Sequence, residues 1–305
     1  MDMNIGVSLP WNYLSGMNIH GDEESSMYFR EHKDAKILLS ILHDAGVSSI
    51  EFRHWNKEIP KQRLVQAFRD VLDAGMGISI HGESLPDAAE EDIHDIFPWM
   101  DLLFGEVMRH AAAPVMLVLH SVRGGISIEE NRRRTVRAFT SYLRDIEAKS
   151  YPVVIAYENQ RAAKLLDPAF QFSTASGVIE ELEEIAQADA AVCWDMGHSY
   201  ANFRISGMEE IPPASFIRRV KHTHIHALHP DTYATHWPLG YGELPLKRYL
   251  GLLDDAGYNG ICNIELSMEK YPEQSVADVL VSSVSFLQEA IDSVSAIETL
   301  SKEMS

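Results

Sequence analysis

Acidic and imidazole side chains recur in this chain at the ends of short apolar segments. The segments are VVIAYENQ, AVCWDMGHS, VKHTHIHAL and ICNIELS; they carry Glu158, then Asp195 with His198, then three histidines, then Glu265. Burying a charged group is costly unless it is paired or bound to a metal, so carboxylates repeated at such positions need a partner. One divalent cation coordinated by two Glu, an Asp and a His would supply it.

The elements that must position these side chains alternate along the whole chain. Short apolar runs predict strands at roughly 4–9, 47–53, 76–81, 114–120, 152–158, 190–195, 219–226 and 260–266. Amphipathic stretches predict helices near 30–45, 61–74, 89–112, 128–148, 176–188, 208–217, 245–256 and 275–297. Eight strand–helix units without a break in composition predict an α/β fold, a single-domain (β/α)8 TIM barrel over 1–297, with a frayed tail at 298–305.

Composition excludes several classes of protein. The chain has 305 residues, 46% of them apolar, and 45 acidic against 26 basic side chains give a net charge of −19. Such an acidic surface repels a phosphate backbone, so we expect no nucleic-acid partner. No apolar run is long enough to cross a bilayer, and no signal peptide is evident at the first residues. Two cysteines in apolar runs fit buried thiols and a reducing, cytoplasmic setting.

In such barrels the chemistry lies at the carboxyl ends of the strands. Ionisable side chains stand at or just past every expected strand end from the second to the eighth: Glu51, Arg53, His54, His81, Glu83, His120, Glu158, Asp195, His198, His222, His224, His226, His236 and Glu265. A single histidine of this kind could be an ordinary core residue. Their recurrence at successive strand ends favours one shared site.

Alternation sorts the three histidines of the seventh expected strand. His222, His224 and His226 share one face, because side chains two positions apart point the same way. If that face looks into the barrel, His222 is deepest, His224 lies at the height of the metal and His226 lies at the rim. Carboxylates with one imidazole suit Mn²⁺, Mg²⁺, Co²⁺ or Zn²⁺, and added histidines such as His81 and His120 favour Zn²⁺.

Taken in order, these motifs resemble one family. They are Glu-Asn at 158–159, D-x-x-H at 195–198, H-x-H on the seventh strand, H-x-x-x-G-x-G at 236–242 and I-E-L around Glu265. The chain is similar over nearly its whole length to the xylose isomerase-like barrels. That group contains sugar and sugar-phosphate isomerases and epimerases and, more distantly, endonuclease IV.

The resemblance implies a metal on Glu158, Asp195, His224 and Glu265. In endonuclease IV further zinc ions are held by histidines that match His81, His120, His198 and His236, so a second metal at His81, His120 and Glu158 is an open alternative. That enzyme also has an acid two positions before the loop histidine. Alanine stands there in this chain, at position 234, which argues against a three-metal cluster and against a DNA-repair nuclease.

The interpretation we favour is a metal-dependent isomerase or epimerase of a small sugar or keto-polyol. The cation would stabilise a developing enediolate, with Glu158 and Glu265 as general base and acid and His198 as a third catalytic side chain. Side chains expected to contact substrate are Trp11, His81, His120, His226 and His236. Without an evident phosphate cradle, an unphosphorylated substrate is favoured, and a homodimer fits the resemblance.

Three other functions stay open at this point. A keto-polyol dehydratase would use the same metal and base, so a lyase is close to the favoured reaction. A zinc-dependent phosphoesterase of the endonuclease IV kind would need the second metal. A non-catalytic barrel could keep the pocket as a ligand sensor, although an intact set of four ligands weighs against it.

Overall fold

Eight parallel strands close into a barrel in which each strand pairs with its neighbours in the sequence. The computed structural model describes residues 3–54, 56–82, 98–107, 114–121, 127–162, 174–184, 191–271 and 273–303. The strands are β1 (Asn4–Pro10), β2 (Val47–Arg53), β3 (Gly77–His81), β4 (Val115–Leu119), β5 (Val153–Glu158), β6 (Ala191–Asp195), β7 (Val220–Ile225) and β8 (Ile261–Ile264). Pairing of β1 with β8 completes the ring. The predicted TIM barrel is therefore confirmed, with every strand close to its expected position.

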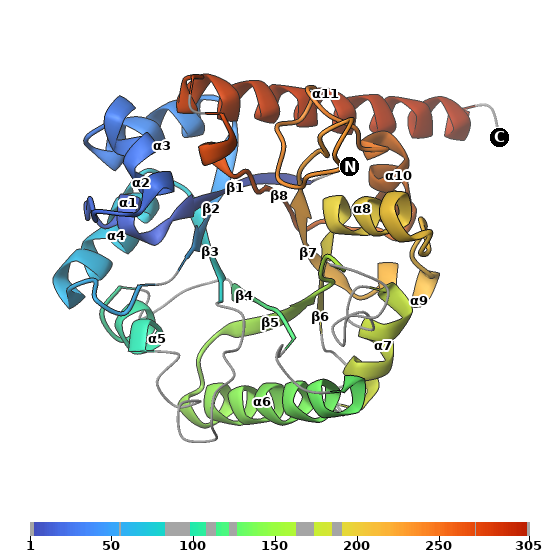
Figure 1. The fold of residues 1–305 in the computed structure, drawn as a ribbon, viewed down its shortest axis with the longest axis horizontal. Helices are drawn as coiled ribbons and strands as arrows, with labels where there is room; N and C mark the ends of the chain where they lie inside the picture. The colour runs from blue at the N-terminus through green and yellow to red at the C-terminus, as the bar shows by residue number, and fades with distance from the viewer. Residues whose placement is uncertain are drawn as a thin grey trace.

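Helices surround the barrel on its outside (Figure 1). They are α1 (Trp11–Leu14), α2 (Glu23–Glu31), α3 (Ala35–Asp44), α4 (Lys61–Asp73), α5 (Pro98–Leu102), α6 (Ile128–Lys149), α7 (Ala175–Glu184), α8 (Met196–Ser206), α9 (Ala214–Ile217), α10 (Leu246–Asp255) and α11 (Val276–Glu303). A π-helical turn at Leu103–Val107 follows α5, and a 3₁₀ turn at Met268–Lys270 follows β8. Within these described helices, none combines the length and the apolar composition needed to cross a membrane.

Local capping explains where the helices differ from the sequence prediction. The helix expected near 30–45 is two helices, because Asp34 accepts a hydrogen bond from the Lys36 amide, 3.0 Å away, and so starts α3 afresh. Helix α8 was missed altogether. It begins directly after β6, where the Asp195 side chain accepts a hydrogen bond from the His198 amide. The expected helix at 208–217 is only the short α9.

Helix α11 continues in helical backbone to Glu303, into the segment 298–305 that was expected as a frayed tail. Figure 1 shows α11 crossing one side of the barrel beside α10. Much of the helix expected near 89–112, namely 89–97 and 108–112, lies outside the described residues.

Aromatic side chains pack where β1 leads into α1. The Trp11 ring centroid lies 4.7 Å from that of Phe52 on β2, 5.6 Å from Phe68 on α4 and 6.2 Å from Trp99 on α5. Trp11 has no exposed surface. This cluster joins three successive strand–helix units into one hydrophobic core, and it lies between the barrel wall and the helices.

Replacing Trp11 with alanine should therefore lower the free energy of unfolding by about 3–5 kcal/mol, the usual cost of emptying a large aromatic core site. The measurement is equilibrium unfolding in urea, with Trp11→Phe as the control that keeps an aromatic ring in place. A Trp11→Ala protein as stable as the wild type would show that these rings do not hold the first strand–helix units together.

Candidate metal centre and active-site cavity

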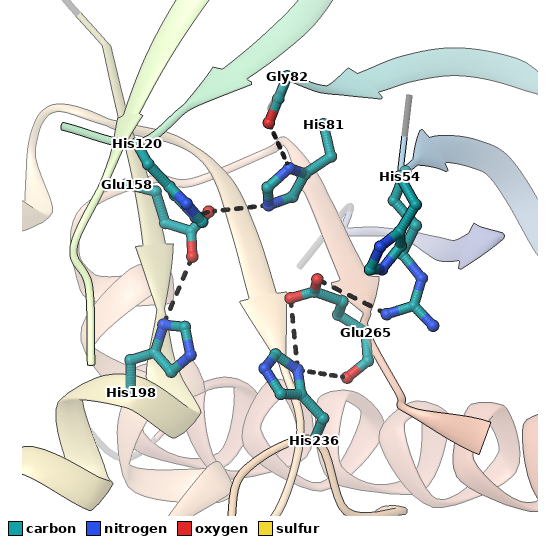
Figure 2. Close-up of a pocket in the computed structure, with 9 residues that line it drawn as sticks. His54, His81, Gly82, His120, Glu158, His198, His236 and Glu265 are labelled. Atoms are coloured by element: carbon teal, nitrogen blue, oxygen red, sulfur yellow. Dashed lines mark hydrogen bonds and ion pairs between the residues drawn. The ribbon is translucent and has the colours of Figure 1, made fainter. Parts of the chain in front are cut away.

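The carboxyl ends of the strands surround a cavity of about 390 Å³ (Figure 2). Small-molecule sites in proteins commonly have volumes of this order. The described residues that line it are Arg53, His54, His81, Gly82, His120, Glu158, His198, His236 and Glu265. The lining is polar and rich in imidazole, so the cavity suits a small polar molecule. Among the predicted site residues, His81, His120, Glu158, His198, His236 and Glu265 are thus gathered around one space.

Imidazoles surround Glu158 at the end of β5. His120 Nε2 lies 2.9 Å and His81 Nε2 lies 3.4 Å from Glu158 Oε2, while His198 Nδ1 lies 3.5 Å from Oε1. His81 Nδ1 donates to the Gly82 carbonyl oxygen at 2.8 Å, so its Nε2 is turned toward Glu158. Figure 2 shows these side chains converging on the carboxylate from β3, β4 and α8.

Glu265, just past β8, enters the cavity from another wall of the barrel (Figure 2). Arg53 Nη1 lies 3.7 Å from Oε1, and His236 Nδ1 lies 3.6 Å from Oε2. Arg53 is itself paired with Glu24 of α2, so its guanidinium has a carboxylate on each side. One oxygen of Glu265 therefore faces a permanent cation, and the other faces imidazoles.

His224 of β7 connects the two glutamates from below. It is fully buried, and its Nδ1 lies 3.2 Å from Glu158 Oε2 and 3.5 Å from Glu265 Oε2. Glu158 Oε1, Glu265 Oε2 and both ring nitrogens of His224 are buried atoms with no hydrogen-bond partner among the described residues. Buried polar atoms are normally satisfied. Unsatisfied ligand-type atoms on two glutamates that both contact His224 fit a divalent cation.

Asp195, the fourth predicted ligand, is directed toward two histidines. Its Oδ2 lies 3.0 Å from His198 Nδ1, and its Oδ1 lies 3.2 Å from His226 Nε2. The backbone N–H of His236 donates to His226 Nδ1 at 2.9 Å, so the hydrogen of the neutral His226 ring lies on Nε2, facing Asp195. Both oxygens of Asp195 are thus held by imidazoles in this structure. His198 also contacts Glu158, so it links Asp195 to another predicted ligand.

His226 was predicted to bind substrate, and it lies outside the described lining of the cavity. Its side chain has no exposed surface. It lies behind Asp195, in space that a side chain on Gly197 would fill, since a Cβ there would be 1.9 Å from His226 Cε1. In this structure His226 contacts Asp195.

Trp11 was expected to cover one face of the substrate. It is fully buried in the aromatic cluster and, like His226, is absent from the described lining of the cavity.

The structure adds Arg53 and His54 to the cavity wall. Both were visible in the sequence at the end of the second strand, but alternation alone gave neither a role. His54 has φ 60° and His236 has φ 61°, a conformation that is uncommon for residues other than glycine. Backbone strain of this kind often occurs at functional sites, and here both strained histidines line the same cavity.

Charge compensation dominates the electrostatics of the site. Burial raises the pKa of a carboxyl group, but His224, His236 and His81 outweigh burial and lower the pKa of Glu265 to about 2. Burial lowers the pKa of an imidazole, yet Glu158 raises the pKa of His81 to about 9. Asp195 likewise raises the pKa of His198 to about 10 against burial. The carboxylates are therefore charged at neutral pH, and a bound cation would displace protons from these imidazoles.

A second group of ligand atoms shares Glu158. Atoms of His81, His120 and Glu158 lie within 4.8 Å of one another, as do atoms of His81, His224 and Glu265. The described residues therefore hold more than one His/Glu cluster able to bind a metal ion.

Solved structures with the same fold include several sugar epimerases. An L-ribulose 3-epimerase superposes with a TM-score of 0.64 at 16% identity, covering 98% of this chain and 97% of that one. A D-allulose 3-epimerase from Methylomonas sp., in complex with D-allulose, gives 0.61 at 15% identity and covers 95% and 100%. The IOLI protein with a bound zinc atom gives 0.57 at 13% identity and covers 94% and 97%.

At these identities the structural similarity shows the shared fold. No curated protein matches the sequence. The family model of the xylose isomerase-like TIM barrel matches residues 39–290, most of the chain and all the strand ends that build the cavity from β2 to β8. The chain therefore belongs to the xylose isomerase-like TIM barrel family.

Proposed function

We propose that this protein is a metal-dependent isomerase or epimerase of a small sugar or keto-polyol. The observation that carries the proposal is a pair of buried, charged glutamates, Glu158 and Glu265, that enter one polar cavity from different walls and approach the same His224 nitrogen. Two of the structural relatives are 3-epimerases of ketoses, which supports this reaction class.

Glu158, His224 and Glu265 would hold the cation, together with Asp195 once its carboxylate turns from His198. The unsatisfied buried atoms of the first three support this set. When bound, a divalent cation would polarise the carbonyl and adjacent hydroxyl of the substrate as a Lewis acid.

The proton transfers belong to the two glutamates. One would remove a proton from the carbon next to the carbonyl, and the other would return a proton from its own side of the cavity. His198 lies 3.5 Å from Glu158 and lines the cavity, so it is placed to hydrogen-bond a substrate oxygen and to keep Glu158 oriented. His81, His120 and His236 would supply further hydrogen bonds to hydroxyl groups. Dehydration of a keto-polyol would begin with the same proton removal, so a lyase is a variant of this proposal.

A second candidate is a zinc-dependent phosphoesterase, which the cluster of His81, His120 and Glu158 favours. Two metals there would activate water and bind phosphate oxygens. We rank it lower because the net charge of −19 opposes a nucleic-acid substrate. Alanine at 234, in place of an acid, removes a further ligand of that chemistry.

The proposed metal ligands can be tested directly by substitution. Glu265→Gln should reduce bound divalent metal, measured by elemental analysis and Zn²⁺ titration, because the site loses a negative charge and a ligand atom. Glu243→Gln, outside the cavity, is the matched control and should retain the metal. Unchanged metal affinity in Glu265→Gln would remove this residue from the ligand set. Two zinc ions per wild-type chain with cleavage of abasic-site DNA would place the phosphoesterase first.

The mechanism makes another prediction. During turnover in D₂O, a carbon-bound hydrogen of the substrate should exchange with solvent, observed by NMR on a ketose panel that includes L-ribulose and D-allulose. Glu158→Gln or Glu265→Gln should slow turnover by roughly 10²–10⁴-fold, the usual contribution of a proton-transfer group, with a smaller effect on unfolding in urea. Turnover without deuterium at carbon would indicate a hydride shift and exclude the two-glutamate mechanism.

A further inference from the structure

A network of buried polar side chains lies below the cavity, where a barrel interior is ordinarily apolar. It consists of Ser8 on β1, Glu51 on β2, His222 and His224 on β7 and Asn263 on β8, all at most 1% exposed. Ser8 is the register partner of Glu51, and Asn263 is the register partner of His224, so all of these strands contribute at neighbouring levels. Burying a charged carboxylate such as Glu51 at this depth costs free energy, so its presence needs an explanation.

Glu51 is held from several sides. Ser8 Oγ donates to Glu51 Oε1 at 2.8 Å, and Asn263 Nδ2 donates to the same oxygen at 3.1 Å. His222 Nε2 lies 2.8 Å from Oε2 and donates to it. These donors fix the carboxylate in one position. Both oxygens of the carboxylate are thus held, and His222 and His224 each turn a ring nitrogen toward it, so this group is better explained as an ion-paired network than as a second metal site.

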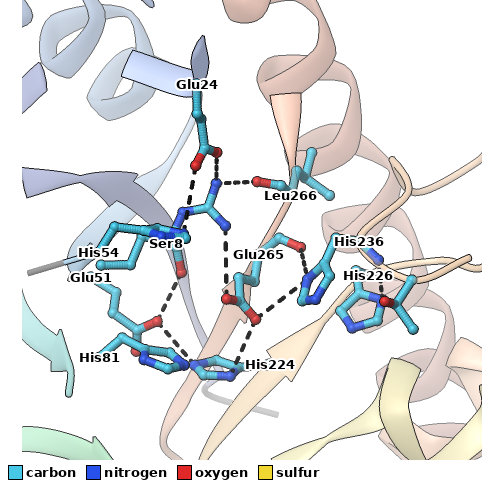
Figure 3. Close-up of polar contacts among 12 residues, drawn as sticks. Ser8, Glu24, Glu51, His54, His81, His224, His226, His236, Glu265 and Leu266 are labelled. Carbon is cyan, nitrogen blue, oxygen red and sulfur yellow. Dashed lines mark hydrogen bonds and ion pairs between the residues drawn. The ribbon is translucent and has the colours of Figure 1, made fainter. Parts of the chain in front are cut away.

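Different glutamates contact the two ring nitrogens of His224. Its Nε2 lies 2.9 Å from Glu51 Oε1, and its Nδ1 lies 3.2 Å from Glu158 Oε2 on the cavity side. Figure 3 shows Glu51 between Ser8 and His224, with Glu265 on the far side of the same ring. When a cation displaces the proton from Nδ1, the ring keeps one N–H, and an acceptor at Nε2 holds that N–H on Nε2 with the Nδ1 lone pair facing the glutamates.

We propose that Glu51 is a positioning residue for the metal centre, which fixes the orientation and tautomer of His224 so that Nδ1 can bind a cation. The inference rests on the proposed function, because it assumes that His224 is a ligand. Metal-bound histidines generally donate their second N–H to a carboxylate or carbonyl, and loss of such a partner typically weakens metal binding about 10–100-fold.

The test compares three variants of the full chain. Glu51→Leu removes the acceptor and should weaken Zn²⁺ binding about 10–100-fold in competition with a chromogenic chelator. Glu51→Gln keeps an acceptor oxygen without the charge and should weaken it less. His222→Leu is the matched control, because it removes another partner of Glu51 at the same depth but presents nothing to the cavity. Its affinity should fall less than that of Glu51→Leu, because Ser8 and Asn263 still hold the carboxylate.

The second readout is ¹⁵N NMR of histidine-labelled, metal-free protein, with His224 assigned by comparison with His224→Gln. The wild type and Glu51→Gln should carry the hydrogen on Nε2, and Glu51→Leu should lose that preference. A wild-type His224 ring without hydrogen on Nε2 would overturn the proposal even if Glu51→Leu does not fold. An equal loss of affinity in His222→Leu would also overturn it.

These readouts separate the inference from the proposed function. If wild-type protein binds no Zn²⁺, the proposed metal centre is wrong. The hydrogen on His224 Nε2 still tests whether Glu51 orients this ring. If the wild type binds Zn²⁺ and folded Glu51→Leu binds it equally well, only the proposed positioning role of Glu51 is wrong.

Discussion

Carboxylates kept charged inside the barrel are the constraint on which the rest of this structure depends. Glu51, Glu158 and Asp195 are fully buried and Glu265 is 6% exposed, so each has lost most of its water. The penalty is several kcal/mol per ion unless partners compensate for it. Imidazoles on neighbouring strands provide that compensation, and they explain why histidines replace apolar side chains around the cavity and below it.

The closed parallel sheet makes this arrangement possible. Since all strands run in one direction, their carboxyl ends meet at one end of the barrel, and groups far apart in the sequence become neighbours. Glu51 and His222 are 171 positions apart, yet their side chains are 2.8 Å apart. Alternation along β7 then separates two levels: His222 lies in the deep network, and His224 links this network to the glutamates that line the cavity.

The sequence was sufficient for the strands and for most of the cavity lining, because both follow from regular alternation and from strand direction. It was insufficient beyond the strand ends, where the chain leaves the regular repeat. Trp11 follows β1 directly, but its ring turns outward into an aromatic cluster that depends on Phe68, distant in sequence. His226 lies one residue past β7, and its ring occupies the space behind Asp195 that is open because residue 197 is glycine. The positions of these two side chains depend on packing between different strand–helix units, which a local sequence pattern does not predict.

The two cavity glutamates are chemically unequal, and this matters for the proposed reaction. Glu158 is surrounded by His81, His120 and His198, which can each carry or release a proton. Glu265 has Arg53 at one oxygen, and a guanidinium keeps its charge at any ordinary pH. Burial lowers the pKa of His120, so this ring can take up a proton that Glu158 accepts, whereas Arg53 can only oppose protonation of Glu265. An acid and a base that act on opposite faces of one carbon need such a difference, because identical environments would give both groups the same proton affinity.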